Sequence, residues 1–194
     1  MKIILASGSP RRSDLLKQIG LDFEVITSDI NESTYSNLSP NDIVLDLALR
    51  KAEAVFDGNL PSQDTLIIAA DTIVAIDDII LGKPNDKEHA FNMLKSLSNK
   101  MHQVYTGVAM YYYLNNKLII ENFADMANVC FRNLSDEEIR EYIDTNEPLD
   151  KAGAYGIQGK GAVLVDHIDG DFYTIVGLPI AKVYTSIIRN IKTK

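Results

Sequence analysis

The chain has 194 residues, of which 46% are hydrophobic, and its formal net charge is −8. This length suits one domain with an ample core, so folding needs neither a metal nor a disulfide. The acidic balance disfavours a broad nucleic-acid surface, although a local cluster of cations can still bind a small anion. Cys130 is the only cysteine, which excludes an intrachain disulfide and favours a reducing cytoplasm. Its apolar neighbours predict a core position.

No stretch approaches the ~20 apolar residues of a membrane span. The apolar run KIILA near the start is shorter than the core of a signal peptide. We therefore expect a cytoplasmic protein that binds neither membranes nor nucleic acid.

Strands and helices are predicted to alternate along the chain. The predicted elements are a strand over 2–6, a helix over 9–20, a strand over 23–30, a helix over 39–56, a strand over 65–76 that turns into 79–82, a helix over 87–97, two strands joined at Asn115-Asn116, a helix over 135–145, a glycine-rich segment, a short hairpin around 169–171 and a closing helix from 179. Interleaved strands and helices with several antiparallel hairpins predict a mixed α/β sheet.

The stretch SGSPRR follows the first strand and begins the first helix. Ser9 is predicted as the N-cap, with Pro10 in the first helical position. Arg11 and Arg12 then lie at the positive end of the helix dipole, where acidic residues are expected. A solvated helix face explains one such arginine, but two arginines beside Ser7 indicate a phosphate-bearing ligand.

Asp71 lies inside the long apolar strand TLIIAADTIVAI. A partly buried carboxylate needs a partner, so Asp71 is either half of a structural salt bridge or a metal ligand or general base. Lys51 projects from the apolar stripe of its helix, and either reaches the surface or points into a pocket. Lys83 follows the turn after the Asp71 strand, which predicts that it lies near Asp71.

Two further segments carry candidate ligands. Glu32 lies in an acidic loop, and together with Asp71 it would supply the hard oxygen ligands that Mg²⁺ or Mn²⁺ prefers. In EPLDKAGAYGIQGKGA, Lys151 and Gln158 lie among four glycines, which suit either a tight turn or a loop around a nucleotide. The three histidines show no metal-ligand spacing and are predicted to be structural or surface residues.

The segments SGSPRR, AADTIV, LGKP, HQVYTG and EPLDKAGAYGIQG, together with the Glu32 loop, resemble the Maf family of nucleoside triphosphate pyrophosphatases. The resemblance runs from Ile3 to about Pro179 and implies one Maf-like domain over residues 1–194. It also implies a mixed twisted sheet flanked by helices, like that of inosine-triphosphate pyrophosphatases, with two lobes around a cleft. The implied reaction is metal-dependent hydrolysis of a nucleoside triphosphate to the monophosphate and pyrophosphate.

The resemblance also implies roles for individual residues. Asp71 matches the proposed proton acceptor, and Glu32 and Asp71 would hold Mg²⁺ or Mn²⁺. The residues that would bind the substrate are Ser7, Arg11, Lys51, Lys83 and Lys151. Arg12, Thr72 and Gln158 match the positions that separate the dTTP/UTP branch from the branch acting on 7-methyl-GTP, and they are similar to the dTTP/UTP branch.

Two other functions stay open at this point. One is a nucleotide-binding regulator of septum formation with little turnover, and the other is a 7-methyl-GTP pyrophosphatase. Physiologically, the implied enzyme would remove unwanted pyrimidine triphosphates, including modified ones. The tyrosine-rich segment AMYYYL is compatible with a homodimer contact or with a buried strand, and the sequence does not distinguish the two.

Overall fold

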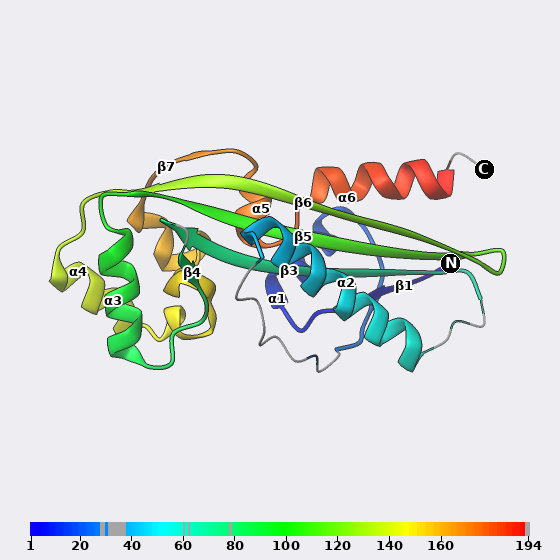
Figure 1. The fold of residues 1–194 in the computed structure, drawn as a ribbon, viewed down its shortest axis with the longest axis horizontal. Coiled ribbons are helices and arrows are strands. Elements are labelled where there is room, and N and C mark those ends of the chain that lie inside the picture. Colours follow the sequence, from blue (N-terminus) through cyan, green and yellow to red (C-terminus); the bar gives the residue numbers. More distant parts are fainter. Residues whose placement is uncertain (28–29, 31–37, 60, 62, 78, 193–194) are drawn as a thin grey trace. The chain divides into compact units, whose positions relative to one another are not determined.

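The computed structural model describes residues 1–27, 30, 38–59, 61, 63–77 and 79–192, which form a mixed α/β fold (Figure 1). Their strands make one seven-stranded sheet in the order β2-β1-β3-β5-β6-β7, with β4 paired to β3. The strands are β1 (Lys2–Leu5), β2 (Glu24–Val25), β3 (Thr65–Ile76), β4 (Ile79–Leu81), β5 (Met101–Leu114), β6 (Lys117–Phe131) and β7 (Val165–Asp169). Strand β1 is parallel to β2 and β3, whereas β4 and β7 are antiparallel to their partners. The predicted mixed sheet flanked by helices is confirmed.

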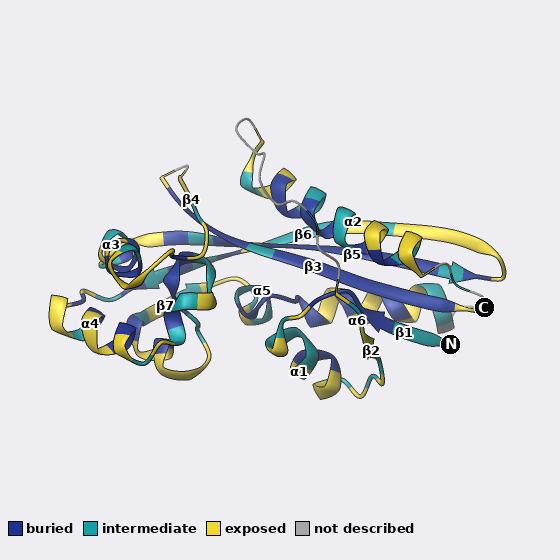
Figure 2. Cartoon of the chain, turned by 90° about the horizontal axis from the view of Figure 1, so that it is seen from below, coloured by how far each residue is buried: buried dark blue, intermediate teal, exposed yellow. Residues whose placement is uncertain are grey.

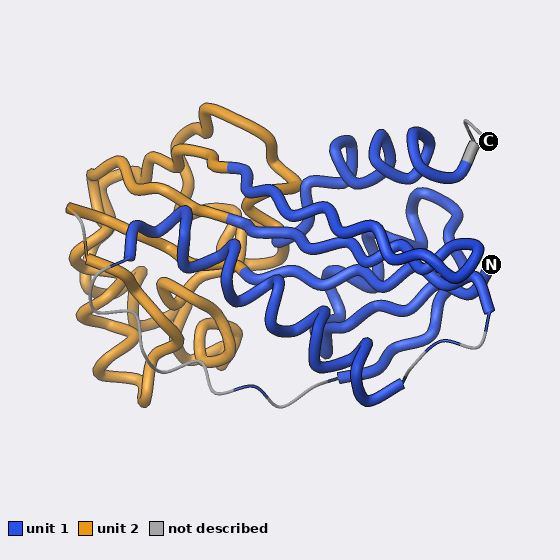
Figure 3. The backbone as a smooth tube through the Cα atoms, turned by 45° about the vertical axis from the view of Figure 1, so that its right-hand side comes forward, with its two compact units in different colours: residues 1–71, 106–125, 177–194 blue, residues 72–105, 126–176 orange. Residues whose placement is uncertain are grey.

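The chain separates into two compact units (Figure 3). Unit 1 comprises Met1–Asp71, Thr106–Asp125 and Gly177–Lys194, and unit 2 comprises Thr72–Tyr105 and Met126–Val176. Strands β3, β5 and β6 contribute residues to both units. The single domain and the cleft that the resemblance implies stay predictions.

Helices cover both faces of the sheet in unit 1. The helix α2 (Pro40–Gly58) packs on residues of β1, β3 and β5 that include Ile67 and Ala109. On the opposite face, the Tyr112 hydroxyl lies 2.6 Å from the Ser186 hydroxyl of α6 (Ile180–Ile187). Residues 109–112 of AMYYYL are buried, so packing within this chain accounts for the apolar character of that segment.

Unit 2 has a core of its own. The helices α3 (Lys87–Leu97) and α4 (Asp136–Asp144) pack together and against strand residues that include Val74, Val104 and Phe131. Ser135 and Glu138 form the capping box that the sequence predicts for α4. Short helical turns η1 (Glu147–Asp150), η2 (Ala152–Ala154) and η3 (Gly159–Leu164) follow α4 and lead into β7.

Burial follows the sequence pattern most closely in β3, which is dark blue along almost its whole length in Figure 2. Eleven of its twelve residues are buried, and the exception is the half-buried Thr72. A run this apolar is typical of a central strand covered on both faces. Among the described residues, every helix is too short or too polar to cross a bilayer.

Two predicted elements are wrong in part. The strand predicted over 23–30 is reduced to β2, with residues 28 and 29 outside the described part. No hairpin forms around 169–171, because the helix α5 (Phe172–Val176) starts directly after Asp171. The Asp171 carboxylate accepts a hydrogen bond from the Tyr173 N–H at 2.9 Å, and its carbonyl accepts one from the Thr174 N–H at 3.1 Å.

Candidate functional site

The turn between β1 and the helix α1 (Pro10–Gln18) is organised by Ser7. Its buried hydroxyl oxygen accepts a hydrogen bond from Arg12 Nη1 at 2.9 Å and one from the Ser9 N–H at 3.3 Å. Ser9 occupies the N-cap position, as predicted, but its side chain makes no capping hydrogen bond. The first turn of α1 is therefore fixed through Ser7.

Arg12 has partners within the protein. Its Nε donates to the carbonyl oxygen of Gly177 at 2.8 Å, in addition to the Ser7 contact. Both contacts lie in unit 1, and the contact with Gly177 joins the start of α1 to the segment that precedes α6. These contacts give a second explanation for a cation at the positive end of a helix, beside the predicted phosphate ligand. Arg11 lies one position earlier on α1 and is half-buried.

Lys51 and Asp71 form a largely enclosed ion pair in unit 1. Lys51 Nζ lies 2.5 Å from Asp71 Oδ1, and the two side chains are 16% and 13% exposed. The apolar stripe of α2 faces the sheet, which brings Lys51 to the middle of β3. Lys51 is therefore held against the sheet by Asp71, and the pocket that the sequence leaves open for it stays a prediction.

The carboxylate of Asp71 also bears on metal binding. Mg²⁺ and Mn²⁺ prefer hard oxygen ligands such as carboxylates. Asp71 supplies a carboxylate that is largely buried but still partly exposed to solvent, so it fits such an ion chemically. Lys51 already holds Oδ1, so a metal at Asp71 either binds Oδ2 beside this contact or displaces it. The second predicted ligand, Glu32, lies outside the described residues.

Lys83 and Thr72 belong to unit 2. The predicted turn after β3 is confirmed, since Val74 pairs with Leu81 in an antiparallel register. Strand β4 ends at Leu81, and Lys83, two residues beyond it, is exposed. The proximity of Lys83 to Asp71 stays a prediction.

A backbone contact joins the LGKP segment to the glycine-rich segment in unit 2. The Gly153 N–H donates to the Gly82 carbonyl at 3.0 Å. Gly153 has a φ of +66°, and a Cβ there would lie 3.0 Å from both methyl carbons of Val74. A larger residue there would be strained by this φ and would crowd Val74. The hydrogen bond to Gly82 thus joins two segments quoted for the family resemblance.

Lys151 and Gln158 differ in their surroundings. Lys151 Nζ donates to the Glu147 carbonyl at 2.6 Å and to Asp150 Oδ1 at 2.7 Å, and its side chain is only 12% exposed. Gln158 is exposed and lies just before η3. A substrate contact by Lys151 therefore competes with partners that it already has.

Glu147 organises the glycine-rich loop and is absent from the residues singled out in the sequence. Its carboxylate accepts hydrogen bonds from the Tyr142 hydroxyl at 3.0 Å, the Lys160 N–H at 3.1 Å and the Gly161 N–H at 3.3 Å. The Tyr142 hydroxyl also accepts from the Gly156 N–H at 3.1 Å. Burial raises the pKa of Tyr142 well above its ordinary value, and the nearby Glu147 adds to this. The signal in the sequence that could have identified Glu147 is its place as the acidic residue that begins the EPLDKAG segment.

His102, in the HQVYTG segment, is fully buried as the predicted structural histidine. Its Nε2 lies 2.8 Å from the Tyr155 hydroxyl, and its Nδ1 is a buried nitrogen that makes no hydrogen bond. Burial lowers the pKa of His102 from 6.5 to about 4. The ring is therefore neutral at physiological pH and packs edge-on against Phe131 and Tyr155.

Fold and site together define an α/β protein in which the Ser7–Arg12 contact follows β1 and the Lys51–Asp71 ion pair lies on its parallel partner β3. The carboxyl ends of parallel strands are where such folds bind ligands. The chain belongs to the Maf family, since residues 2–190 match the family described as Maf-like protein.

Curated relatives cover almost the whole chain. A protein of Bacillus anthracis named dTTP/UTP pyrophosphatase is 50% identical over 181 residues, which are 93% of this chain and 91% of the relative. A protein of Bacillus cytotoxicus with the same name is 51% identical over the same shares.

Two solved structures are similar to this chain over most of its length. The nucleoside-triphosphatase/dITP/XTP pyrophosphatase of Mycobacterium abscessus aligns over 96% of this chain and 94% of its own, with 16% identity and a TM-score of 0.44. The Ham1 protein of Staphylococcus aureus aligns over 85% and 80%, with 14% identity and a TM-score of 0.43.

Proposed function

We propose that this chain is a nucleoside triphosphate pyrophosphatase that hydrolyses dTTP and UTP to the monophosphate and pyrophosphate. The observation that carries this proposal is the 50% identity, over 93% of the chain, to relatives named dTTP/UTP pyrophosphatase. Removal of unwanted pyrimidine triphosphates, including modified ones, is the physiological role that such an activity would serve.

In this proposal, Asp71 is the catalytic carboxylate. The oxygen of a water molecule bonds to the α-phosphorus, the bond from that phosphorus to the bridging oxygen breaks, and pyrophosphate leaves. Asp71 accepts the proton that the water loses, and Lys51 holds its carboxylate in place through Oδ1. A general base of this kind contributes about 10²–10⁴-fold to the rate.

A divalent cation, Mg²⁺ or Mn²⁺, would be held by Asp71 and Glu32 and would neutralise charge on the triphosphate. The hard oxygen donor chemistry of Asp71 supports this assignment. In unit 1, Ser7, Arg11 and Lys51 are proposed to bind phosphate, with Arg12 contributing to the choice of substrate. In unit 2, Lys83 and Lys151 are proposed to bind the substrate, and Thr72 and Gln158 to select the base.

The test is pyrophosphate release from dTTP, UTP, CTP, dATP, GTP and 7-methyl-GTP, with Mg²⁺, with Mn²⁺ and with a chelator. We expect release from dTTP and UTP only, and none in the chelator. Turnover that favours 7-methyl-GTP would keep the enzyme class but overturn the substrate, and binding without release would indicate a regulator.

Asp71→Asn is the decisive variant, and Asp46→Asn is its matched control. Asp46 also pairs with a cation of α2, Arg50, but this i,i+4 pair is more exposed. Asp71→Asn should lower kcat by about 10²–10⁴-fold, whereas Asp46→Asn should leave it unchanged. Near-normal turnover by folded Asp71→Asn would remove Asp71 from the mechanism. The cytoplasmic location and the homodimer stay predictions.

A further inference from the structure

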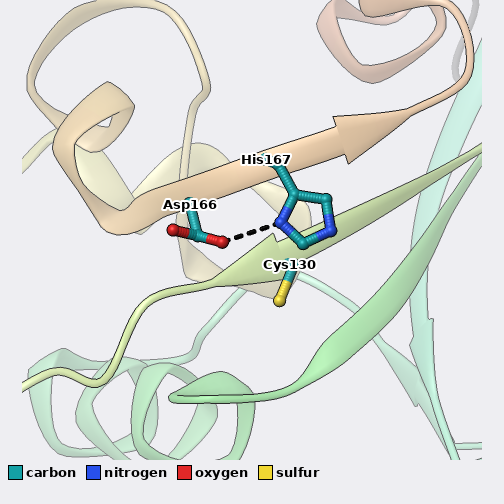
Figure 4. A group of neighbouring side chains, drawn as sticks. All are labelled: Cys130, Asp166 and His167. Atoms are coloured by element: carbon teal, nitrogen blue, oxygen red, sulfur yellow. Dashed lines mark hydrogen bonds and ion pairs between the residues drawn. The ribbon is translucent and has the colours of Figure 1, made fainter.

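Unit 2 brings together a sulfur, a nitrogen and an oxygen donor that the proposed reaction does not use. Cys130 lies on β6, and Asp166 and His167 lie on β7 (Figure 4). One potential ligand atom from each of the three side chains lies within 4.8 Å of the other two. In the described part of the chain, this is the one such group of three.

The backbone explains why three side chains meet here. Cys130 and His167 are direct partners in the antiparallel β6–β7 pair, so their side chains project from the same face. The next pair is Phe131 with Val165, which leaves Asp166 as an extra residue on β7. Strict alternation would turn Asp166 to the face opposite His167. The bulge breaks this alternation, and a bulge commonly redirects a side chain in this way.

A hydrogen bond shows that Asp166 does lie beside the imidazole. His167 Nδ1 is 2.7 Å from Asp166 Oδ2. A metal ion that binds both the carboxylate and the imidazole takes the place of this hydrogen bond, and the contact shows that the two groups lie side by side. The histidine of this cluster is therefore held in a defined position next to Cys130.

The donor set selects the kind of metal. Thiolate, imidazole and carboxylate together suit Zn²⁺, whereas Mg²⁺ and Mn²⁺ prefer oxygen donors alone. Zn²⁺ bonds of about 2.0–2.3 Å place tetrahedral ligand atoms roughly 3.5 Å apart. The side chains of His167 and Asp166 are 56% and 61% exposed, so small rotations can bring their ligand atoms that close.

We propose that Cys130, Asp166 and His167 form a Zn²⁺ site with three protein ligands and a fourth position open to water or an external ligand. Binding displaces the proton of the Cys130 thiol to solvent and forms a zinc–thiolate bond. The site shares no residue with the proposed pyrophosphatase chemistry, so failure of one proposal would leave the other unaffected.

No sequence pattern indicates this site. The apolar neighbours of Cys130 predict a core position, and the histidines show no metal-ligand spacing, which predicts structural or surface residues. Cys130 is in fact only half-buried. The ligands come from strands far apart in the chain, and the bulge that aligns Asp166 leaves no recognisable spacing pattern.

The experiment is a Co²⁺ titration of the full chain, followed by the sulfur-to-cobalt charge-transfer absorption in the near ultraviolet. Because Cys130 is the only cysteine, any such band reports this site alone. We expect a saturable band that one equivalent of Zn²⁺ removes and that excess Mg²⁺ leaves in place. Failure of saturating Co²⁺ to produce the band would overturn the proposal.

Three variants complete the test, each checked for an unchanged unfolding temperature. Cys130→Ser should show no band, and His167→Gln should raise the Co²⁺ midpoint at least about tenfold. The matched control is His89→Gln, which alters a histidine of α3 in the same unit and should leave the midpoint unchanged. A midpoint in His167→Gln equal to that of the wild type would also overturn the proposal.

Discussion

Lys51 Nζ lies 2.5 Å from Asp71 Oδ1, so the candidate catalytic carboxylate is already half of an ion pair. With the two side chains 16% and 13% exposed, little solvent screens the contact. Removing one member of such a pair leaves the other as an uncompensated charge, which is strongly destabilising. Lys51 and a divalent cation also compete for the same carboxylate, and this competition can be measured.

Lys51→Met should lower the free energy of unfolding by about 3 kcal/mol, since Asp71 loses its cation. For a chain of this length, the loss corresponds to a Tm lower by roughly 6–12 °C. If Asp71 holds a metal, Mg²⁺ should restore part of this loss. Thermal unfolding with and without Mg²⁺ measures both effects.

The Mg²⁺-dependent rise in Tm should be larger in Lys51→Met than in the wild type and absent in Asp71→Asn. Asp46→Asn, which breaks the more exposed pair with Arg50, should respond to Mg²⁺ as the wild type does. Equal Mg²⁺ responses in all four proteins would show that Asp71 is not a metal ligand.

Ser7→Ala and Ser9→Ala should differ in stability, although both serines lie in the same turn. Ser7→Ala removes the acceptor of two hydrogen bonds, from Arg12 Nη1 and the Ser9 N–H, and should cost about 1–2 kcal/mol. Ser9 makes no side-chain cap, so Ser9→Ala should stay within about 0.5 kcal/mol. Urea unfolding of the two variants decides the point, and a larger loss in Ser9→Ala would contradict it.

Local signals predicted most of the fold. The strand over 65–76, the helix over 87–97 and the hairpin turn at Asn115-Asn116 all match the structure, because apolar patterning and turn residues define them without tertiary information. The hairpin expected around 169–171 failed for a local reason as well. Asp171 is equally suited to a turn and to the start of a helix, and its hydrogen bonds to Tyr173 and Thr174 select the helix.

The site was less predictable, because its contacts join residues from separate elements. The apolar stripe of α2 left both the surface and a pocket open for Lys51, and only the packing of α2 on the sheet identifies Asp71 as its partner. Glu147 was missed for the same reason, since its role depends on how the loop after Gly156 folds back onto it.

Gly107 lies in the HQVYTG segment quoted for the family resemblance, and packing alone requires a glycine at this position. A Cβ at this position would lie 2.1 Å from the carbonyl oxygen of Val44, because α2 crosses β5 closely there. Gly107→Ala should therefore destabilise the chain by about 3 kcal/mol or more. Gly58→Ala is the control, since nothing lies within 4 Å of its Cβ, and it should be neutral or slightly stabilising. Chemical denaturation compares them, and equal stabilities would contradict the close approach.

Glu147→Gln should loosen the glycine-rich loop. Lys160 N–H and Gly161 N–H donate to different oxygens of the Glu147 carboxylate, and Gln replaces one of these oxygens by an amide nitrogen that cannot accept, so one of the two hydrogen bonds is lost. Losing about 1.5 kcal/mol of loop stability should raise trypsin cleavage after the exposed Lys160 about tenfold. Intact-mass spectrometry identifies the cut.

The control for Glu147→Gln is Glu141→Gln, which makes the same chemical change at an exposed position of α4. Its rate of cleavage after Lys160 should equal that of the wild type. If both variants are cleaved at the wild-type rate, Glu147 does not hold the loop.

His102 should make the chain less stable in acid. Burial lowers its pKa to about 4 in the folded state, whereas the unfolded side chain has the ordinary value of 6.5. Between these values the unfolded chain binds a proton that the folded chain excludes, so stability falls as the pH falls through this window. The loss approaches about 1.4 kcal/mol per pH unit and about 3 kcal/mol in all. His102→Phe, which removes the titrating group but keeps an aromatic ring, should show a shallower pH dependence of the urea midpoint between pH 6.5 and 4. His89→Phe should keep the wild-type slope, and an unchanged slope in His102→Phe would assign the acid sensitivity to other groups.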